Sequence, residues 1–247
     1  MKKIVSIVFI LVFACNSEDA LDCFQTAGTI IQHEVSVPDF DRILVNRDIE
    51  LIIKQDNSFS VVIETGENLL NEVSAEVVGD QLILTDANTC NYVRDYGITK
   101  VYVSAPDLRE IRTSTQYDIS SDGVLPYENL VLLSEDFTVD ADFTVGDFRL
   151  QVNSENLRIT SNNISFFYIS GQTTNLNVGF FAGTGRFEGA DLIADHVTVS
   201  HRSSNDMVVN PQLSLTGVIR GTGNVVSKNQ PAFVDIEELY TGRLIFE

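Results

Sequence analysis

Short runs of alternating apolar and polar residues recur along this chain, and no segment shows a convincing helical period. Clear examples are 49–53, 60–64, 81–85 and 101–104, which are rich in valine, isoleucine and leucine. Glycine, asparagine and aspartate separate several of these runs, and these residues tolerate the backbone angles of tight turns. The pattern therefore predicts an all-β protein built from short strands.

A sequence repeat begins near residue 107. Apolar residues recur there at intervals of 22, 18, 19, 20, 20 and 18 residues. The members of this first column are Leu108, Leu130, Phe148, Phe167, Phe187, Met207 and Val225. A second column lies about nine residues further on, at Val139, Leu157, Leu176, Val197 and Val234. A period near 20 with two short strands per unit is typical of a β-solenoid, in which each coil buries its apolar side against the next.

A β-sandwich is the competing interpretation, because sandwiches also place short strands at regular intervals. The matching offsets of the two columns favour a solenoid over residues 106–247, with coils of about 18–22 residues. Residues 29–105 are then predicted to form a smaller β unit that covers the open end of the solenoid. Some cover is expected there because an exposed strand edge invites aggregation.

The first 14 residues have the character of a secretory signal peptide. Lys2 and Lys3 precede a stretch that is apolar from Ile4 to Ala14 except for Ser6. Such a stretch is too short to span a bilayer, which needs roughly 20 apolar residues. Residues 1–14 are therefore predicted to be removed on export.

The signal peptide ends in the segment 12–15, which resembles the lipobox of bacterial lipoproteins. The resemblance implies cleavage before Cys15, acylation of that cysteine and a tether over residues 15–28. An ordinary signal peptide with a chance cysteine remains the alternative. Residues 16–19 also resemble the short acidic tag that directs lipoproteins of Bacteroidetes-type bacteria to the cell surface, or they are simply a solvated tether.

Two further cysteines, Cys23 and Cys90, allow one intramolecular disulfide. An oxidising envelope permits this bond. It would join the end of the tether to the body, but the sequence alone leaves open whether the two cysteines meet.

The chain is strongly acidic, with a formal charge of −19 that becomes −21 once Lys2 and Lys3 are removed. Such a charge repels nucleic acids and anionic lipid surfaces, so nucleic-acid binding is not expected. The apolar fraction of 44% is ordinary for a folded domain. The acidity therefore belongs to the surface of a packed protein.

The segment 103–111, the glycine-turned repeats, the segment 221–225, Pro231 and Gly242 together resemble the head GIN domain family. This family of adhesin-like proteins is common among secreted and lipid-anchored proteins of Bacteroidetes, and the resemblance spans most of residues 34–247. It implies an all-β fold of the right-handed parallel β-helix-like solenoid type and a cell-surface location, with no established chemistry. Ser227 and Asn229 replace the tyrosine and glycine frequent in the family, which puts shared ligand contacts in doubt.

The sequence carries no catalytic signature. His33-Glu34 lacks the second histidine of a zinc-protease motif, and no Gly-x-Ser-x-Gly nucleophile segment occurs. His196 and His201 are five residues apart on one predicted strand, which places them on opposite faces. Both are expected to be solvated or turn histidines, and no cofactor is predicted.

Acidic residues gather between Arg112 and Arg149, where no lysine or arginine occurs. The candidates are Asp118, Asp122, Asp136, Asp140, Asp142 and Asp147. Carboxylates that converge from neighbouring coils bind calcium, whereas scattered ones form a solvated acidic face. A polysaccharide lyase would also require a basic residue in the same groove.

Tyrosines are the other binding candidates, because their rings stack on sugars and on partner surfaces. The candidates are Tyr92, Tyr96, Tyr127 and Tyr168. The sequence thus predicts a non-enzymatic, outer-membrane lipoprotein, exposed on the cell surface, that binds a glycan or a protein. A lyase-like β-helix enzyme and a structural or sensory envelope component, facing the periplasm, are the alternatives.

Overall fold

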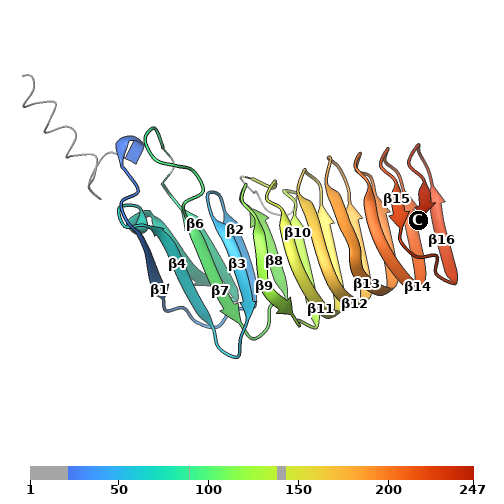
Figure 1. The fold of residues 1–247 in the computed structure, drawn as a ribbon, viewed down its shortest axis with the longest axis horizontal. Coiled ribbons are helices and arrows are strands. Elements are labelled where there is room, and N and C mark those ends of the chain that lie inside the picture. Colours follow the sequence, from blue (N-terminus) through green and yellow to red (C-terminus); the bar gives the residue numbers. More distant parts are fainter. Residues whose placement is uncertain (1–21, 89, 138–142) are drawn as a thin grey trace, which may run out of the picture.

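The computed structural model describes residues 22–88, 90–137 and 143–247. The described residues form 17 strands and two three-residue 3-10 turns, and the strands join one hydrogen-bonded sheet that nearly closes around an apolar core. The strands are stacked along the long axis of the molecule, from the N-terminal region at one end to the C-terminus at the other (Figure 1). The prediction of an all-β protein is confirmed.

The N-terminal part contains η1 (Asp22–Phe24), β1 (Ile30–Val35), β2 (Arg42–Asn46), β3 (Glu50–Gln55), β4 (Ser60–Gly66), η2 (Leu70–Glu72), β5 (Val73–Val78), β6 (Gln81–Asp86) and β7 (Lys100–Ala105). The remaining strands are β8 (Glu110–Ser114), β9 (Ile119–Leu125), β10 (Asn129–Ser134), β11 (Phe148–Ser161), β12 (Phe166–Phe180), β13 (Arg186–His201), β14 (Met207–Ile219), β15 (Val225–Ser227), β16 (Phe233–Glu238) and β17 (Leu244–Phe246). Strands predicted at 49–53, 60–64, 81–85 and 101–104 correspond to β3, β4, β6 and β7.

The strands lie in two rows that enclose the core. One row runs β5, β6, β2, β8, β10, the second halves of β11 to β14, and β16. The other runs β1, β4, β7, β3, β9, the first halves of β11 to β14, β15 and β17. Every neighbour pair is parallel except β1–β4, β4–β7 and β5–β6, which lie at the N-terminal end.

The register of these strands confirms most of the first predicted column. Phe148 pairs with Phe167, Phe167 with Phe187, Phe187 with Met207 and Met207 with Val225. All five side chains are fully buried, and the rings of Phe148 and Phe167 are stacked with 4.9 Å between centroids. In the second column, Leu157, Leu176 and Val197 pair in the same way.

The predicted assignment is wrong for two members of the first column. Leu130 pairs with Leu157 and so belongs to the second column, and Leu108 is buried in the loop between β7 and β8. Residues 135–147 separate β10 from β11 in the sequence, so the spacing between apolar positions is longer there. Counting a constant interval across this segment therefore assigns Leu130 to the wrong column. Leu215, which was not predicted, pairs with Val197 and with Val234, while Val139 lies outside the described residues.

Hydrogen bonding is continuous across the predicted boundary at residue 105. β2 pairs in parallel with β8, and β3 pairs in parallel with β9. Ile43 and Leu51 thereby join the same apolar core as Ile111 and Ile119. The division into units of 29–105 and 106–247 stays a prediction.

Glycine is required where successive coils approach most closely. Gly171 has φ +106° and Gly217 has φ +130°. A Cβ atom at these positions would lie 2.0 Å from the carbonyl oxygen of Val152 and 1.9 Å from that of Val199, respectively. These two glycines therefore allow the backbones of adjacent coils to stack without a clash.

His201 contradicts the prediction of a solvated or turn histidine, because its side chain is fully buried near the ring of Phe180. No described residue forms a hydrogen bond of good geometry with either ring nitrogen. Burial lowers the pKa of His201 below its ordinary value of 6.5, although the nearby Asp206 carboxylate opposes this shift. His201 lies on the same side of β13 as Val197 and Val199, which are also buried, so the regular alternation of the strand carries it into the core.

Truncation of Phe167 to alanine should remove the ring at the centre of the phenylalanine column. We expect the free energy of unfolding to fall by about 3–5 kcal/mol, since the rigid coils above and below leave a cavity. Asn177→Ala, an exposed position on the same strand, is the control and should change it by less than about 0.5 kcal/mol. Urea unfolding measures both, and equal stability of the two variants would refute the register.

Acid should destabilise the protein partly through His201. Because the folded state disfavours protonation, the stabilising contribution of neutral His201 is complete above its ordinary pKa of 6.5 and is lost as the pH falls below that value. His201→Phe should therefore lose less stability than the wild type between pH 7 and pH 5. Melting curves across this range test the difference, and parallel losses in both proteins would contradict it.

Candidate functional site

The N-terminal end of the molecule carries a loop, residues 87–99, that the start of the chain holds in place. Cys23 and Cys90 form a disulfide with 4.4 Å between their α-carbons. The backbone N–H of Tyr92 donates to the carbonyl of Cys23 at 3.0 Å. The Arg94 guanidinium donates to the carbonyls of Gln25 and Asn88, each at 3.2 Å. The loop is therefore tied at several points to residues 23–25, near the end of the predicted tether.

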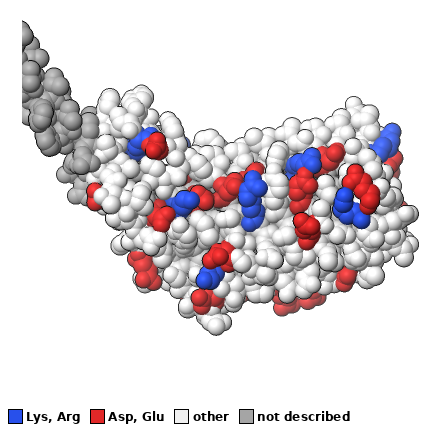
Figure 2. All heavy atoms as spheres, in the orientation of Figure 1, with Lys and Arg blue, Asp and Glu red and all other residues white. Residues whose placement is uncertain are grey.

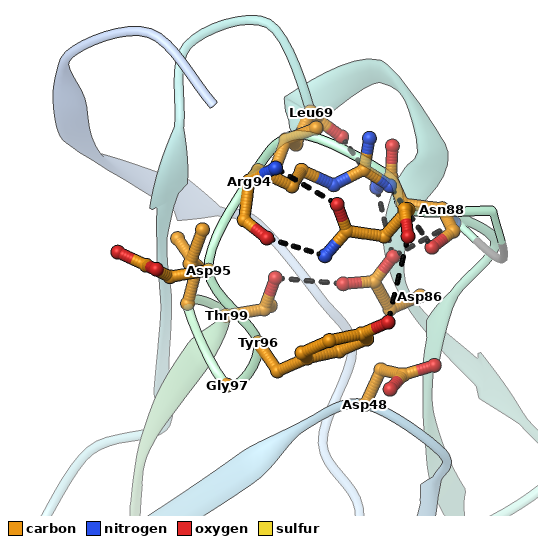
Figure 3. A pocket seen from close by; sticks show the side chains of 11 residues that line it. Asp48, Leu69, Asp86, Asn88, Arg94, Asp95, Tyr96, Gly97 and Thr99 are labelled. Atoms are coloured by element: carbon orange, nitrogen blue, oxygen red, sulfur yellow. Dashed lines mark hydrogen bonds between the residues drawn. The ribbon is translucent and has the colours of Figure 1, made fainter. Parts of the chain in front are cut away.

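A hollow lies beneath this loop, between it and the turns at the ends of β2 and β6 (Figure 3). At its floor, the buried Asp86 carboxylate accepts hydrogen bonds from the Thr99 hydroxyl at 2.6 Å and from the Asn88 side-chain amide at 2.8 Å. Burial raises the pKa of Asp86, and these hydrogen bonds limit the rise by stabilising the carboxylate. Figure 3 shows Asp86 directed toward Thr99, whereas Asp95 points away from the hollow.

The other polar groups around the hollow also bond to one another. Asn91 accepts the backbone N–H of Arg94 at 2.9 Å and donates to the carbonyl of the same residue at 2.7 Å. Asp48, at φ +66°, accepts from the Gln116 amide at 2.6 Å. The described residues that line the hollow include no histidine, serine or cysteine. The arrangement therefore stiffens the loop and does not present an activated nucleophile.

The four predicted tyrosines have different environments. Tyr92 and Tyr96 are 74% and 76% exposed and lie on the loop 87–99. Tyr127 is only 1% exposed and donates from its hydroxyl to the carbonyl of Ala105 at 3.2 Å, so its prediction as a binding residue is wrong. Tyr168 is half-buried, and the Arg149 guanidinium lies 4.2 Å from its ring centroid. The structure thus brings together only Tyr92 and Tyr96.

The predicted acidic residues are spread over the surface. Asp118 and Asp147 both contact Arg149, at 2.7 and 3.2 Å. Asp136 accepts from the Asn162 side chain at 2.6 Å, and Asp122 is exposed. Asp140 and Asp142 lie outside the described residues. Within the described part of the chain, no three histidine, cysteine, aspartate or glutamate side chains come together as a metal site.

Figure 2 shows that the charges on one face are mostly arranged in pairs, with basic side chains beside acidic ones. A buried example was not predicted: Arg112 donates to the Glu135 carboxylate at 2.5 Å, and both side chains are almost inaccessible. From the sequence, Arg112 marks only the start of a stretch that lacks lysine and arginine. Arg112 and Glu135 are 23 residues apart in the sequence, and the pairing of β8 with β10 brings them together.

The C-terminal end exposes the last coil of the stack, made of β15, β16 and β17 (Figure 1). β16 pairs only with β14, and β17 pairs only with β15, so one edge of each strand is open in the described structure. The exposed large apolar residues here are Phe233, Val234, Leu239, Tyr240, Ile245 and Phe246, which we call the terminal apolar surface. Val234 continues the second column, and its place in that column was the signal that the sequence offered for this strand.

Within the described residues, no helix combines the length and apolar character that a membrane crossing requires. A search of curated proteins finds no match to the chain. Solved structures match over nearly the whole length. A protein described as a "putative adhesin" from Bacteroides fragilis has a TM-score of 0.79 at 18% identity and covers 90% of this chain and 99% of its own.

Two further structures come from Parabacteroides. A "putative adhesin" from P. merdae has a TM-score of 0.61 at 14% identity, covering 89% of this chain and 97% of its own. A "putative lipid binding protein" from P. distasonis has a TM-score of 0.59 at 16% identity, covering 88% and 97%. At these identities the likeness shows a shared fold. A family model matches residues 39–231, and the chain belongs to that family, described as "Putative auto-transporter adhesin, head GIN domain".

Proposed function

We propose that this protein is a non-enzymatic binding module of the cell surface, attached to the outer membrane by acyl chains on Cys15. Membership of an adhesin-like family supports the surface location and the binding role. The segment 12–15 supports the anchor, because it has the residue order of a lipobox. Cys15 itself lies outside the described residues. The net charge makes nucleic acid an unsuitable ligand.

The observation that carries this proposal is the terminal apolar surface. In a stack of coils, each coil covers the apolar side of the one before it, and the last coil normally carries a polar outer face. Here Tyr240 and Phe233 are 60% and 56% exposed, and among the described strands none pairs with the outer edges of β16 and β17, which carry Val234 and Leu244. A surface of this kind is a binding site for a partner.

The partner that this surface fits best is an extended segment of another protein. The open edges of β16 and β17 offer backbone donors and acceptors that a strand pairs with, and the apolar side chains supply pockets between them. Asp235, Glu237 and Glu238 on β16 make the edge acidic, so a strand with basic residues is favoured over an acidic one. A glycan lacks the regularly spaced backbone N–H and C=O groups that pair with an open strand edge.

We also propose that the all-β fold is a right-handed parallel solenoid. Parallel pairing with offsets of 19 to 21 residues from β11 to β13 supports a solenoid that winds through both rows in each coil. We assign it the right-handed sense of a parallel β-helix, since crossovers between parallel strands of one sheet are almost always right-handed. The two rows would then be successive sides of one winding chain.

A lyase-like activity is less well supported by the geometry. The acidic residues nearest a basic one, Asp118 and Asp147, are ion-paired with Arg149 on an exposed part of the surface. Arg149 also lies over the ring of Tyr168, which occupies the face that a sugar would stack on. The function proposed here requires no cofactor, and calcium would act only as an added ligand of surface carboxylates.

A photo-crosslinking residue at position 240 tests this function on intact cells that produce the protein. We expect a discrete protein adduct, because Tyr240 is the most exposed residue of the terminal apolar surface. The matched control is position 78, an equally exposed valine on the edge strand β5 at the opposite end. Gel mobility, with protease and glycosidase digestion of the adduct, identifies its class.

A glycan adduct at position 240 would contradict a protein partner, and the same adduct from position 78 would contradict binding at the C-terminal end. The anchor is tested in the same cells. Cys15→Ser should leave the membrane fraction or remain unprocessed. Retained lipid labelling of that variant would show that Cys15 is not the site of attachment.

A further inference from the structure

A second exposed apolar surface lies at the opposite end of the molecule, around the disulfide. Its exposed residues are Phe24, Tyr92, Val93 and Tyr96, which we call the aromatic patch. The ring centroids of Phe24 and Tyr92 are 5.7 Å apart, so the end of the predicted tether packs against the loop 87–99 that carries the other three residues. Neither the fold nor the proposed binding at the terminal apolar surface requires these side chains to be exposed.

The patch is held in place and is not a loosely exposed loop. The Cys23–Cys90 disulfide joins its two segments, and the backbone hydrogen bond from Tyr92 to Cys23 aligns them. Asn91 closes the turn that carries Val93, and the Arg94 side chain fastens the loop to Gln25. Such a rigid frame keeps large apolar side chains in water unless another surface covers them.

The length of the tether decides which surface is nearby. Cys15 and Cys23 are eight residues apart, so a fully extended chain of about 3.6 Å per residue holds Cys23 within about 29 Å of the anchor. The described strands of the second row number eleven, and ten intervals of about 4.8 Å make the stack about 48 Å long. The aromatic patch is therefore held within about 29 Å of the anchor, whereas the terminal apolar surface lies at the other end of a stack about 48 Å long.

The charge of the patch also suits a lipid surface. Between Cys90 and Gly97 the charged side chains are Arg94 and Asp95, which balance, whereas the whole chain carries −19. Tyrosine is enriched at membrane–water interfaces because its ring is apolar and its hydroxyl is polar. Asp22, two residues before Phe24, leaves the two segments of the patch with one net negative charge. A tyrosine-rich surface of such low charge fits the headgroup layer of a zwitterionic membrane, while the acidic remainder is repelled from anionic lipid.

We propose that the aromatic patch rests in the headgroup layer of the membrane that carries the anchor, so that the stack of coils points away from the surface. This inference rests on the acylation of Cys15 proposed above. It assigns the two exposed tyrosines to the membrane and leaves the opposite end of the molecule free for a partner. A glycan or a protein on the aromatic patch would be the alternative occupant.

Tryptophan fluorescence tests the contact, because the chain contains no tryptophan. The mature chain from Cys15 is prepared with Tyr92→Trp or, as a matched control at the opposite end, Tyr240→Trp. Cys23 and Cys90 are bonded to each other, so the Cys15 thiol is free to couple to a maleimide headgroup in phosphatidylcholine vesicles. This coupling supplies the anchor whether or not cells acylate the protein, which separates failure of the inference from failure of the proposed anchor.

Brominated lipids quench tryptophan that enters the bilayer interface. We expect the fluorescence of Tyr92→Trp to be quenched at least about twofold more than that of Tyr240→Trp, with an emission shift to shorter wavelength. Replacing Val93 and Tyr96 by serine in the Tyr92→Trp chain should reduce this quenching. Equal quenching at positions 92 and 240 would overturn an upright arrangement, and unquenched emission at position 92 would overturn the lipid contact itself.

Discussion

The long strands β11 to β14 pair in parallel and bury their apolar side chains against those of the strands before and after them, because a single layer of strands is too thin to enclose a core of its own. The stacked rings of Phe148 and Phe167, continued by Phe187 and Met207, form the centre of this arrangement. The parallel register puts equivalent residues directly above one another. Close approach of the coils in turn requires glycine at Gly171 and Gly217, where any side chain would meet a carbonyl oxygen.

Because apolar side chains are buried only between neighbouring strands, the two ends of the stack need a different arrangement, and the two ends differ from each other. At the N-terminal end, the antiparallel strands β1, β4 and β5 stop the parallel series, and the edge strand β1 exposes polar residues such as Gln32 and Glu34. At the C-terminal end, the last coil leaves its columns uncovered. An anchor at Cys15 would hold the first end near the membrane by the short tether, so the proposed partner and the proposed lipid contact each occupy the end where the structure exposes apolar side chains.

Much of the stack could be predicted from the sequence, because strand alternation and a period near 20 are local properties of the chain. The register failed at Leu130, where the long segment before β11 changes the interval and only the pairing with Leu157 reveals the correct column. Burial of Tyr127 could not be predicted, since tyrosine is common on surfaces and in cores alike, whereas alternation from Val197 does place His201 on the buried side of its strand. The Arg112–Glu135 pair depends on contact between neighbouring strands, and no spacing in the sequence identifies it.

The central claim is that each coil derives its stability from two neighbours and that the last coil has only one. Hydrogen–deuterium exchange of the isolated mature protein measures this directly, strand by strand. The account predicts strong protection of β12 and β13 and rapid exchange in β16 and β17, which lack a covering coil. Protection of β16 and β17 equal to that of β12 would contradict it, because the end of the stack would then be stable without a partner.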